Sequence, residues 1–351
     1  MVVELLAAAD ALLPMRPDLA VAVLVQAMEV GERAADGDGW LAAAGVAVAA
    51  RGGVGDGRTT AIEVLAGIDR WGPTALTSQS ARRLRVELAL LAAGSTETEL
   101  VRALVGPVLG ALPDHRAHAA ARMALARAAA DPAESAAALR LAHERCPDDA
   151  AGRVLRAELK LVAASIARRD LAPRAAAEAA AEGLNLLSDG PIADAHVDLR
   201  MSLTAESIAA LLDSGDAHQA RAQAAIGQNL LARSRAPRRQ RALLRLSVAS
   251  ALAGSRETAV TVADLVAAGR EAVECDAPDL EAICRSALGA IHEQAGRLDS
   301  ALEEIRAGVD AQHRDRDREV TFLAAVEAVL DRESPPDEER PAEEPRAASS
   351  A

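Results

Sequence analysis

The stretch ICRSALGAIHEQAGRLDSALEEIRAGV, residues 283–309, decides the fold. Apolar residues recur on both sides of its central glycine at intervals of three to five residues: Ile283, Leu288, Ile291 and Ala295 before it, and Leu298, Leu302, Ile305 and Val309 after it. Such intervals place each set on one face of a helix. Gly296, between the sets, permits the left-handed conformation that ends helices. The stretch therefore predicts two antiparallel helices joined by a short turn.

Turn signals of this kind recur along the whole chain with a period of about 40 residues. One series consists of Met15–Pro17, Gly55–Gly57, Gly94–Ser95, Asp131–Pro132, Arg169–Asp170, Gly215–Asp216, Gly254–Ser255 and Gly296–Arg297. A second series interleaves with it and consists of Asp36–Gly39, Trp71–Pro73, Pro113–Asp114, Pro147–Asp149, Asp189–Pro191, Ala236–Pro237, Asp276–Pro278 and Asp315–Asp317. Two interleaved series with one period predict about eight helical hairpins.

The composition supports an all-α fold. The 351 residues include two Trp, one Phe and no Tyr, and the chain is rich in Ala, Leu, Arg and Glu, which favour helices. A β-sandwich draws instead on aromatic and β-branched residues. In three hairpins an alanine follows the turn glycine by five residues: Gly215 and Ala220, Gly254 and Ala259, and Gly296 and Ala301. We expect these alanines where paired helices cross.

Residues 283–309 resemble a tetratricopeptide repeat (TPR), whose pattern is W-x2-L-G-x2-Y, then A-x3-F, then P. The matching residues are Leu288, Gly289, His292 at the tyrosine position, Gly296, Ala301, and Ile305 at the phenylalanine position; Arg285 replaces the tryptophan and the closing proline is missing. The resemblance implies an α–α superhelix whose first helices line a concave wall. The longer period, over residues 2–315, resembles the arrays of MalT-like and LuxR-type bacterial activators and of actinobacterial signalling proteins. Those arrays usually adjoin an output domain, and we expect no such domain within these 351 residues.

The array is expected to span residues 1–332. Residues 317–332 are expected to form a capping helix over the last repeat, because a terminal repeat leaves one face unpaired. Residues 333–351 are rich in Pro, Glu and Ala and are expected to be a disordered acidic tail. No apolar run is long enough for a membrane span, and no signal peptide is recognisable at the N-terminus. With three cysteines interpreted as reduced thiols, we expect a cytoplasmic protein.

No catalytic constellation or metal-binding spacing stands out, so we expect a non-enzymatic protein without a cofactor. The nearest approach to a phosphate-binding loop is residues 52–59, GGVGDGRT, which almost fit G-x4-G-K-[ST]. Arg58 replaces the lysine of that motif, and the glycines fall where the period requires a turn. A nucleotide-binding protein is therefore a remote alternative.

The leading hypothesis is a scaffold or adaptor that binds a peptide or partner protein on its concave face. A sensor of a ligand or peptide, acting on a separate output protein, is the alternative. Candidate binding residues are an arginine cluster, Arg233, Arg235, Arg238, Arg239, Arg241 and Arg245, and three wall positions taken from the TPR pattern, Ser286, Ala290 and Glu293. A second cluster, Arg82, Arg83 and Arg85, opens another helix. The net charge of −13 disfavours nucleic acid as a partner, and a homodimer is left open.

Overall fold

The computed structural model describes residues 1–12, 17–55, 57–72, 75–95, 97–112, 115–233, 238–253 and 258–333. In these ranges the chain forms helices and turns without a strand. The α-helices pair into eight consecutive hairpins: α1 (Val2–Leu12) with α2 (Pro17–Arg33), α3 (Gly37–Val54) with α4 (Gly57–Ile68), α5 (Arg82–Ala92) with α6 (Thr98–Leu109), α7 (His115–Ala128) with α8 (Pro132–His143), α9 (Ala150–Arg169) with α10 (Pro173–Leu186), α12 (Val197–Asp213) with α13 (Ala217–Arg233), α14 (Arg238–Leu252) with α15 (Thr258–Glu274), and α16 (Pro278–Gln294) with α17 (Leu298–Glu333). The predicted all-α superhelix of about eight hairpins is confirmed.

Shorter elements fill two of the connections between hairpins. The 3-10 helices η1 (Asp69–Trp71) and η2 (Ala75–Thr77) lie between α4 and α5, and α11 (Gly190–Ala195) lies between α10 and α12. Within the ranges given above, no helix is both long enough and apolar enough to cross a membrane.

Turn chemistry sets the ends of the helices as expected. Gly215 and Gly296 have φ angles of 80° and 71°, which glycine adopts readily because it has no β-carbon. Asp131 and Asp149 cap the helices that follow them, because each carboxylate accepts a hydrogen bond from a backbone N–H of the first turn. Local sequence therefore determines where these helices begin and end.

Alanine provides the close contact between many helices. Ala220 and Ala301 are buried at helix crossings, as predicted, and a core cluster between α9, α10 and α12 consists entirely of alanines. The prediction for Ala259 is wrong, since that residue is exposed. Thr261 is buried two positions later instead. Small side chains let neighbouring helices approach closely enough to exclude water without aromatic rings.

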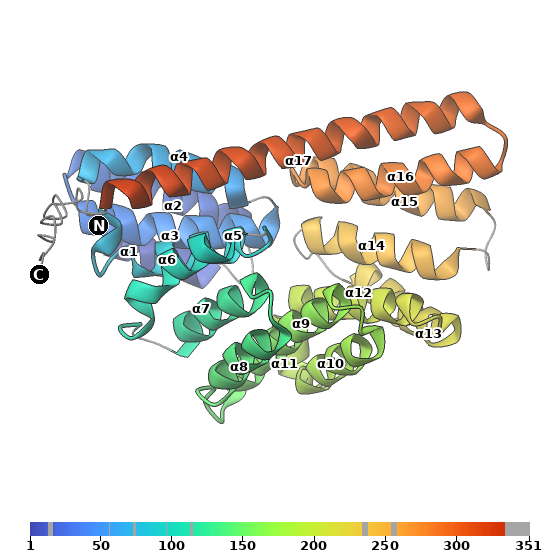
Figure 1. Ribbon diagram of the computed structural model, residues 1–351, viewed down its shortest axis with the longest axis horizontal. Helices are drawn as coiled ribbons and strands as arrows, with labels where there is room; N and C mark the ends of the chain where they lie inside the picture. Colours follow the sequence, from blue (N-terminus) through green and yellow to red (C-terminus); the bar gives the residue numbers. More distant parts are fainter. Residues whose placement is uncertain are drawn as a thin grey trace, which may run out of the picture.

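The last helix departs from the prediction. No turn occurs at Asp315–Asp317, because α17 runs unbroken for 36 residues. The expected separate capping helix at 317–332 is the second half of α17, and it does not cover the last repeat. It packs against α4 at the opposite end of the array, where Phe322, Val326 and Val329 are buried in the N-terminal core. Figure 1 shows α17 lying across both the C-terminal hairpins and the N-terminal ones. The superhelix is thereby closed on itself.

Ion pairs fix the second half of α17 on the N-terminal hairpins. Arg58 contacts Asp315 at 3.1 Å, and Arg332 pairs with Asp69. The third pair is almost completely buried: Arg85 Nη1 lies 2.9 Å from Glu333 Oε2, and the two side chains are 3% and 8% exposed.

Arg85 also completes the hydrogen bonding of α6. Its Nη2 donates to the carbonyl oxygen of Ala103 at 2.8 Å, and its Nε donates to that of Leu104 at 2.9 Å. Pro107 lies inside α6, and it has no N–H to donate to the carbonyl four residues earlier, which is that of Ala103. The guanidinium therefore supplies a donor that the proline removed. An arginine of the second cluster is thus a core residue of the closed array.

Candidate functional site

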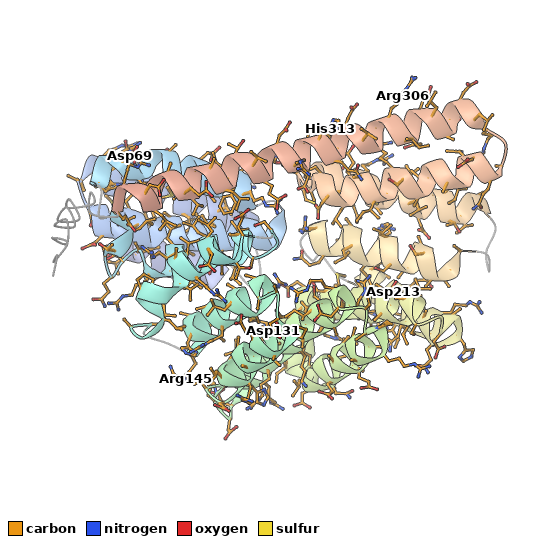
Figure 2. All side chains as sticks on the ribbon, viewed as in Figure 1. Asp69, Asp131, Arg145, Asp213, Arg306 and His313 are labelled. Carbon is orange, nitrogen blue, oxygen red and sulfur yellow. The ribbon has the colours of Figure 1, made fainter. Side chains whose placement is uncertain are left out.

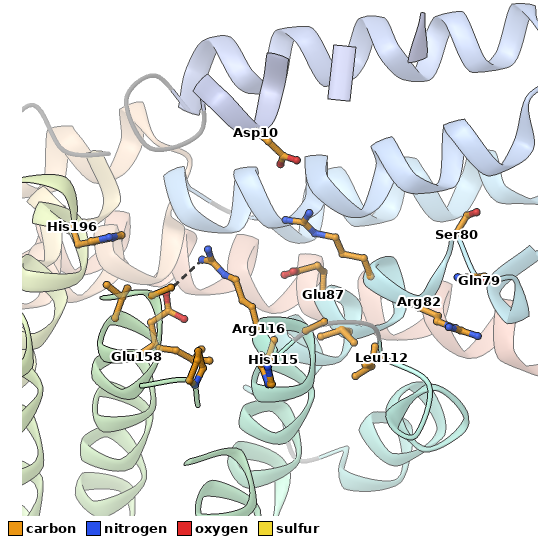
Figure 3. A pocket seen from close by; sticks show the side chains of 18 residues that line it. Asp10, Gln79, Ser80, Arg82, Glu87, Leu112, His115, Arg116, Glu158 and His196 are labelled. Carbon is orange, nitrogen blue, oxygen red and sulfur yellow. Dashed lines mark hydrogen bonds and ion pairs between the residues drawn. The ribbon is translucent and has the colours of Figure 1, made fainter. Parts of the chain in front are cut away.

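A cavity of ≈ 810 Å³ opens on the first helices of successive hairpins. Most of its lining comes from α5, α7 and α9; Asp10 on α1, His196 just before α12 and residues just before α5, α7 and α9 supply the rest (Figure 3). The apolar part of the lining includes Val86, Ala120 and Leu155, which are buried. The cavity therefore lies on the wall made by first helices, the wall that the repeat pattern implied for binding.

Two half-buried carboxyl groups line this cavity. Glu87 on α5 has no hydrogen bond or ion pair with any described residue. Burial raises its pKa to about 7, against the opposing effect of Arg83 and Arg116 and with a smaller contribution from Glu158. Burial likewise raises the pKa of Glu158 on α9. The pKa of Glu87 therefore lies near neutral pH, where an ordinary glutamate is fully ionised.

Arginines line the same space. Arg116 Nη2 lies 3.5 Å from Glu158 Oε1, a contact that Figure 3 marks with a dashed line. Arg116 is 80% exposed, so its guanidinium can move to another acceptor at little cost. Arg82 and Arg83 also line the cavity. Both signs of charge and an apolar surface thus lie within one space, which suits a ligand that carries amine, carboxylate and apolar groups together.

The predicted arginine cluster has partners inside the chain. Arg239 makes a two-pronged ion pair with Asp279, at 2.9 and 2.8 Å. Arg241 and Arg245 both contact Glu271, at 3.5 and 3.2 Å. Burial alone would raise the pKa of Asp279, but hydrogen bonding and charge from Arg239 leave that pKa below its usual value. These pairs join α14 to α15 and α16.

For the other three members of the cluster the structure describes no partner inside the chain. Arg233 is exposed at the end of α13. Arg235 and the side chain of Arg238 lie outside the described residues. Partner binding by the cluster stays a prediction.

The three predicted wall residues share an exposed face of α16. Ser286, Ala290 and Glu293 are all exposed, and the Ser286 hydroxyl donates to the carbonyl oxygen of Ala282 within the same helix. None of them lines the cavity. Their part in binding also stays a prediction.

The glycine-rich stretch 52–59 is divided between two helices and the short turn that joins them. Residues 52–54 belong to α3, and α4 begins at Gly57. Arg58, at the lysine position of the phosphate-binding motif, lies among the carboxylates of α17, 3.1 Å from Asp315 and 3.7 Å from Glu319. These contacts argue against the nucleotide-binding alternative.

The sequence does not bring the residues of the cavity together as a site. It shows Arg82 and Arg83 only as a cluster, and it does not distinguish Glu87, Arg116 or Glu158 from other charged residues on helices. The signal available was a charged residue on the wall side of each of three successive first helices. Among the described residues, no group of three His, Cys, Asp or Glu side chains converges as a metal site would require.

No protein-family model and no curated protein matches the chain. A solved structure that does match is the apo form of the quorum sensor NprR from B. thuringiensis, at 13% sequence identity. The match covers 83% of this chain and 82% of the NprR chain, with a TM-score of 0.57. At this identity the likeness establishes architecture alone, and it places the chain among TPR-like helical-repeat structures.

Proposed function

We propose that the chain is a non-enzymatic binding module that takes a peptide, or a short segment of a partner protein, into the cavity between α5, α7 and α9. The observation that carries the proposal is the mixed lining of this cavity, above all the half-buried Glu87 carboxyl group without an ion-pair partner. A carboxyl group that is partly removed from water and has no partner costs free energy, which a cationic ligand group would recover.

The lining suggests how a peptide would lie. A ligand amine or basic side chain would bind Glu87 and Glu158, and it would lower their raised pKa values. Peptide carboxylates or carbonyl groups would bind Arg83 and Arg116. Apolar side chains of the peptide would pack on the buried part of the lining.

A sensing role is the form of this proposal that we favour. Its support is the likeness in fold to a protein described as a quorum sensor. In such a role the peptide is a signal, and the bound module acts on a separate output protein. A constitutive scaffold would use the same cavity without a response to the ligand.

The test begins with selection of peptides that bind the full chain from a random peptide library, followed by calorimetry on variants. Ala151→Trp fills the cavity from an exposed position on α9, and Ala150→Trp adds the same ring at the neighbouring exposed position outside it. We expect Ala151→Trp to weaken binding at least tenfold, about 1.4 kcal/mol, and Ala150→Trp to leave it unchanged. Peptides that bind both variants as tightly as the native chain would refute the assignment of the cavity.

A second measurement concerns the charge of Glu87. Glu87→Gln removes the carboxylate with little change in volume, and Glu303→Gln makes the same change at an exposed site on α17. We expect Glu87→Gln to weaken the binding of peptides that have a free amine. In the native chain the affinity for such peptides should rise as the pH increases through about 7, and Glu87→Gln should remove this rise. Glu303→Gln should change neither the affinity nor its pH dependence. Native affinity at every pH in Glu87→Gln would contradict the proposed contact.

A further inference from the structure

The first half of α17 carries an uncovered apolar stripe. Leu298, Leu302, Ile305 and Val309 are 67%, 46%, 45% and 42% exposed. Their spacing of four, three and four residues places them in one line along the helix, over about 16 Å. Side chains of this size are rarely left in water as a contiguous row unless something binds there.

The architecture explains why the stripe is uncovered. In the repeats before it, the second helix of a hairpin also packs near the next hairpin, but α17 belongs to the last one. The second half of α17 does not fold back, because it continues straight to the N-terminal core. Residues 334–351 are not suited to covering the stripe either. They contain no Leu, Ile, Val or Phe, and the helix that precedes them ends 24 residues, or about 36 Å, beyond Val309.

The stripe is complementary to itself. When two copies of α17 pack antiparallel about a twofold axis near residues 303 and 304, Leu298 of one copy faces Val309 of the other, and Leu302 faces Ile305. All four layers of such an interface are apolar, with the heptad-like spacing that lets helices interlock. The same surface serves on both copies, as closed twofold dimers require.

The charges beside the stripe fit the same arrangement. Asp299 and Arg306 are exposed and seven residues apart, so they lie on one side of the helix, and neither has an ion-pair partner among the residues that the structure describes. Figure 2 shows Arg306 pointing away from the body of the molecule. In the antiparallel pairing Asp299 of each copy lies beside Arg306 of the other, which gives two equivalent opposite-charge contacts.

We propose that the chain forms a homodimer through this stripe, residues 298–309 of α17. Four apolar side chains in each copy make a small interface compared with the roughly 1,200 Å² or more of surface that stable complexes bury. We therefore expect the dimer to be in equilibrium with monomer.

Sedimentation velocity of the full chain over a range of concentrations tests the proposal. Leu302→Glu places a charge opposite Ile305 of the partner copy and is expected to raise the dissociation constant at least tenfold. Val273→Glu makes the same kind of change at an exposed valine of α15 and is expected to leave the constant unchanged. Unchanged circular dichroism in both variants would separate loss of association from loss of folding.

A charge exchange identifies the occupant as a second copy. Asp299→Arg alone and Arg306→Asp alone each bring like charges together and are expected to weaken the dimer about threefold or more, whereas the two together restore it. A chain that remains monomeric at every concentration would overturn the proposal. So would a dimer unaffected by Leu302→Glu, or a double exchange no better than either single change.

Discussion

The buried pair between Arg85 and Glu333 is the sharpest test of the closed superhelix. Arg85→Met removes the guanidinium and leaves the Glu333 carboxylate in a site where the side chain is 8% exposed. Breaking a buried ion pair in this way costs about 3–5 kcal/mol, because the remaining charge is neither solvated nor paired. We expect the free energy of unfolding to fall by that amount.

The structure also predicts how much stability two further variants should recover. Replacing both partners, Arg85→Met with Glu333→Leu, removes the uncompensated charge and should recover most of the loss, except for the unpaired Ala103 carbonyl, which costs about 1–3 kcal/mol. Adding Pro107→Ala restores an N–H four residues after Ala103, so the helix itself can then satisfy that carbonyl. The order of stability should be native, then triple, then double, then single variant.

Urea unfolding followed by circular dichroism gives these differences. Hydrogen exchange shows where the structure opens, and we expect residues 317–333 to lose protection first in Arg85→Met. A loss of less than about 1 kcal/mol in the single variant, or a double variant no more stable than the single one, would refute the argument that a buried pair closes the array.

Three further predictions follow from single sites. The folded-state pKa of Glu87 is raised to about 7, so the folded chain binds the proton more tightly than the unfolded chain does. The native chain should therefore lose stability as the pH rises from about 4.5 through 7, as measured by thermal unfolding. Glu87→Gln should abolish this part of the pH dependence. A Cβ on Gly55 would lie 2.1 Å from the carbonyl oxygen of Cys275, so Gly55→Ala should lower the melting temperature, whereas Gly110→Ala, which meets nothing within 4 Å, should not. Burial raises the pKa of the Cys284 thiol to about 12, so this cysteine should react with a thiol reagent only after denaturation, and reaction in the native state would contradict its buried position.

The hairpins could be predicted from sequence because their ends are encoded locally. Even the turn at Arg169–Asp170, which has no glycine, is followed by Pro173 at the start of the next helix. The stretch at Asp315–Asp317 has only charge to suggest a turn, and no glycine or proline occurs between Val309 and Glu333. A helix continues when nothing interrupts its hydrogen bonds.

The cavity could not be predicted in the same way. Glu87 and Glu158 are 71 residues apart, and a raised pKa depends on which helices exclude water around each carboxyl group. The buried position of Arg85 could not be predicted from sequence for a similar reason. Its sequence neighbours Arg82 and Arg83 line the cavity, whereas Arg85 points into the core, a difference that arises from the angle of 100° per residue around α5.

The route of α17 has a consequence for the time at which the protein can fold. The N-terminal core includes Trp40, Leu84 and Val101, but Phe322 and Val326 complete it. A ribosome that has made residue 101 must add more than 200 residues before those side chains exist, which takes about 10–40 s at about 5–20 residues per second. During that interval the first hairpins expose apolar surface that only the far end of the same chain can cover. An open solenoid could fold repeat by repeat as it is made, whereas this one must wait for a helix made near the end of its synthesis.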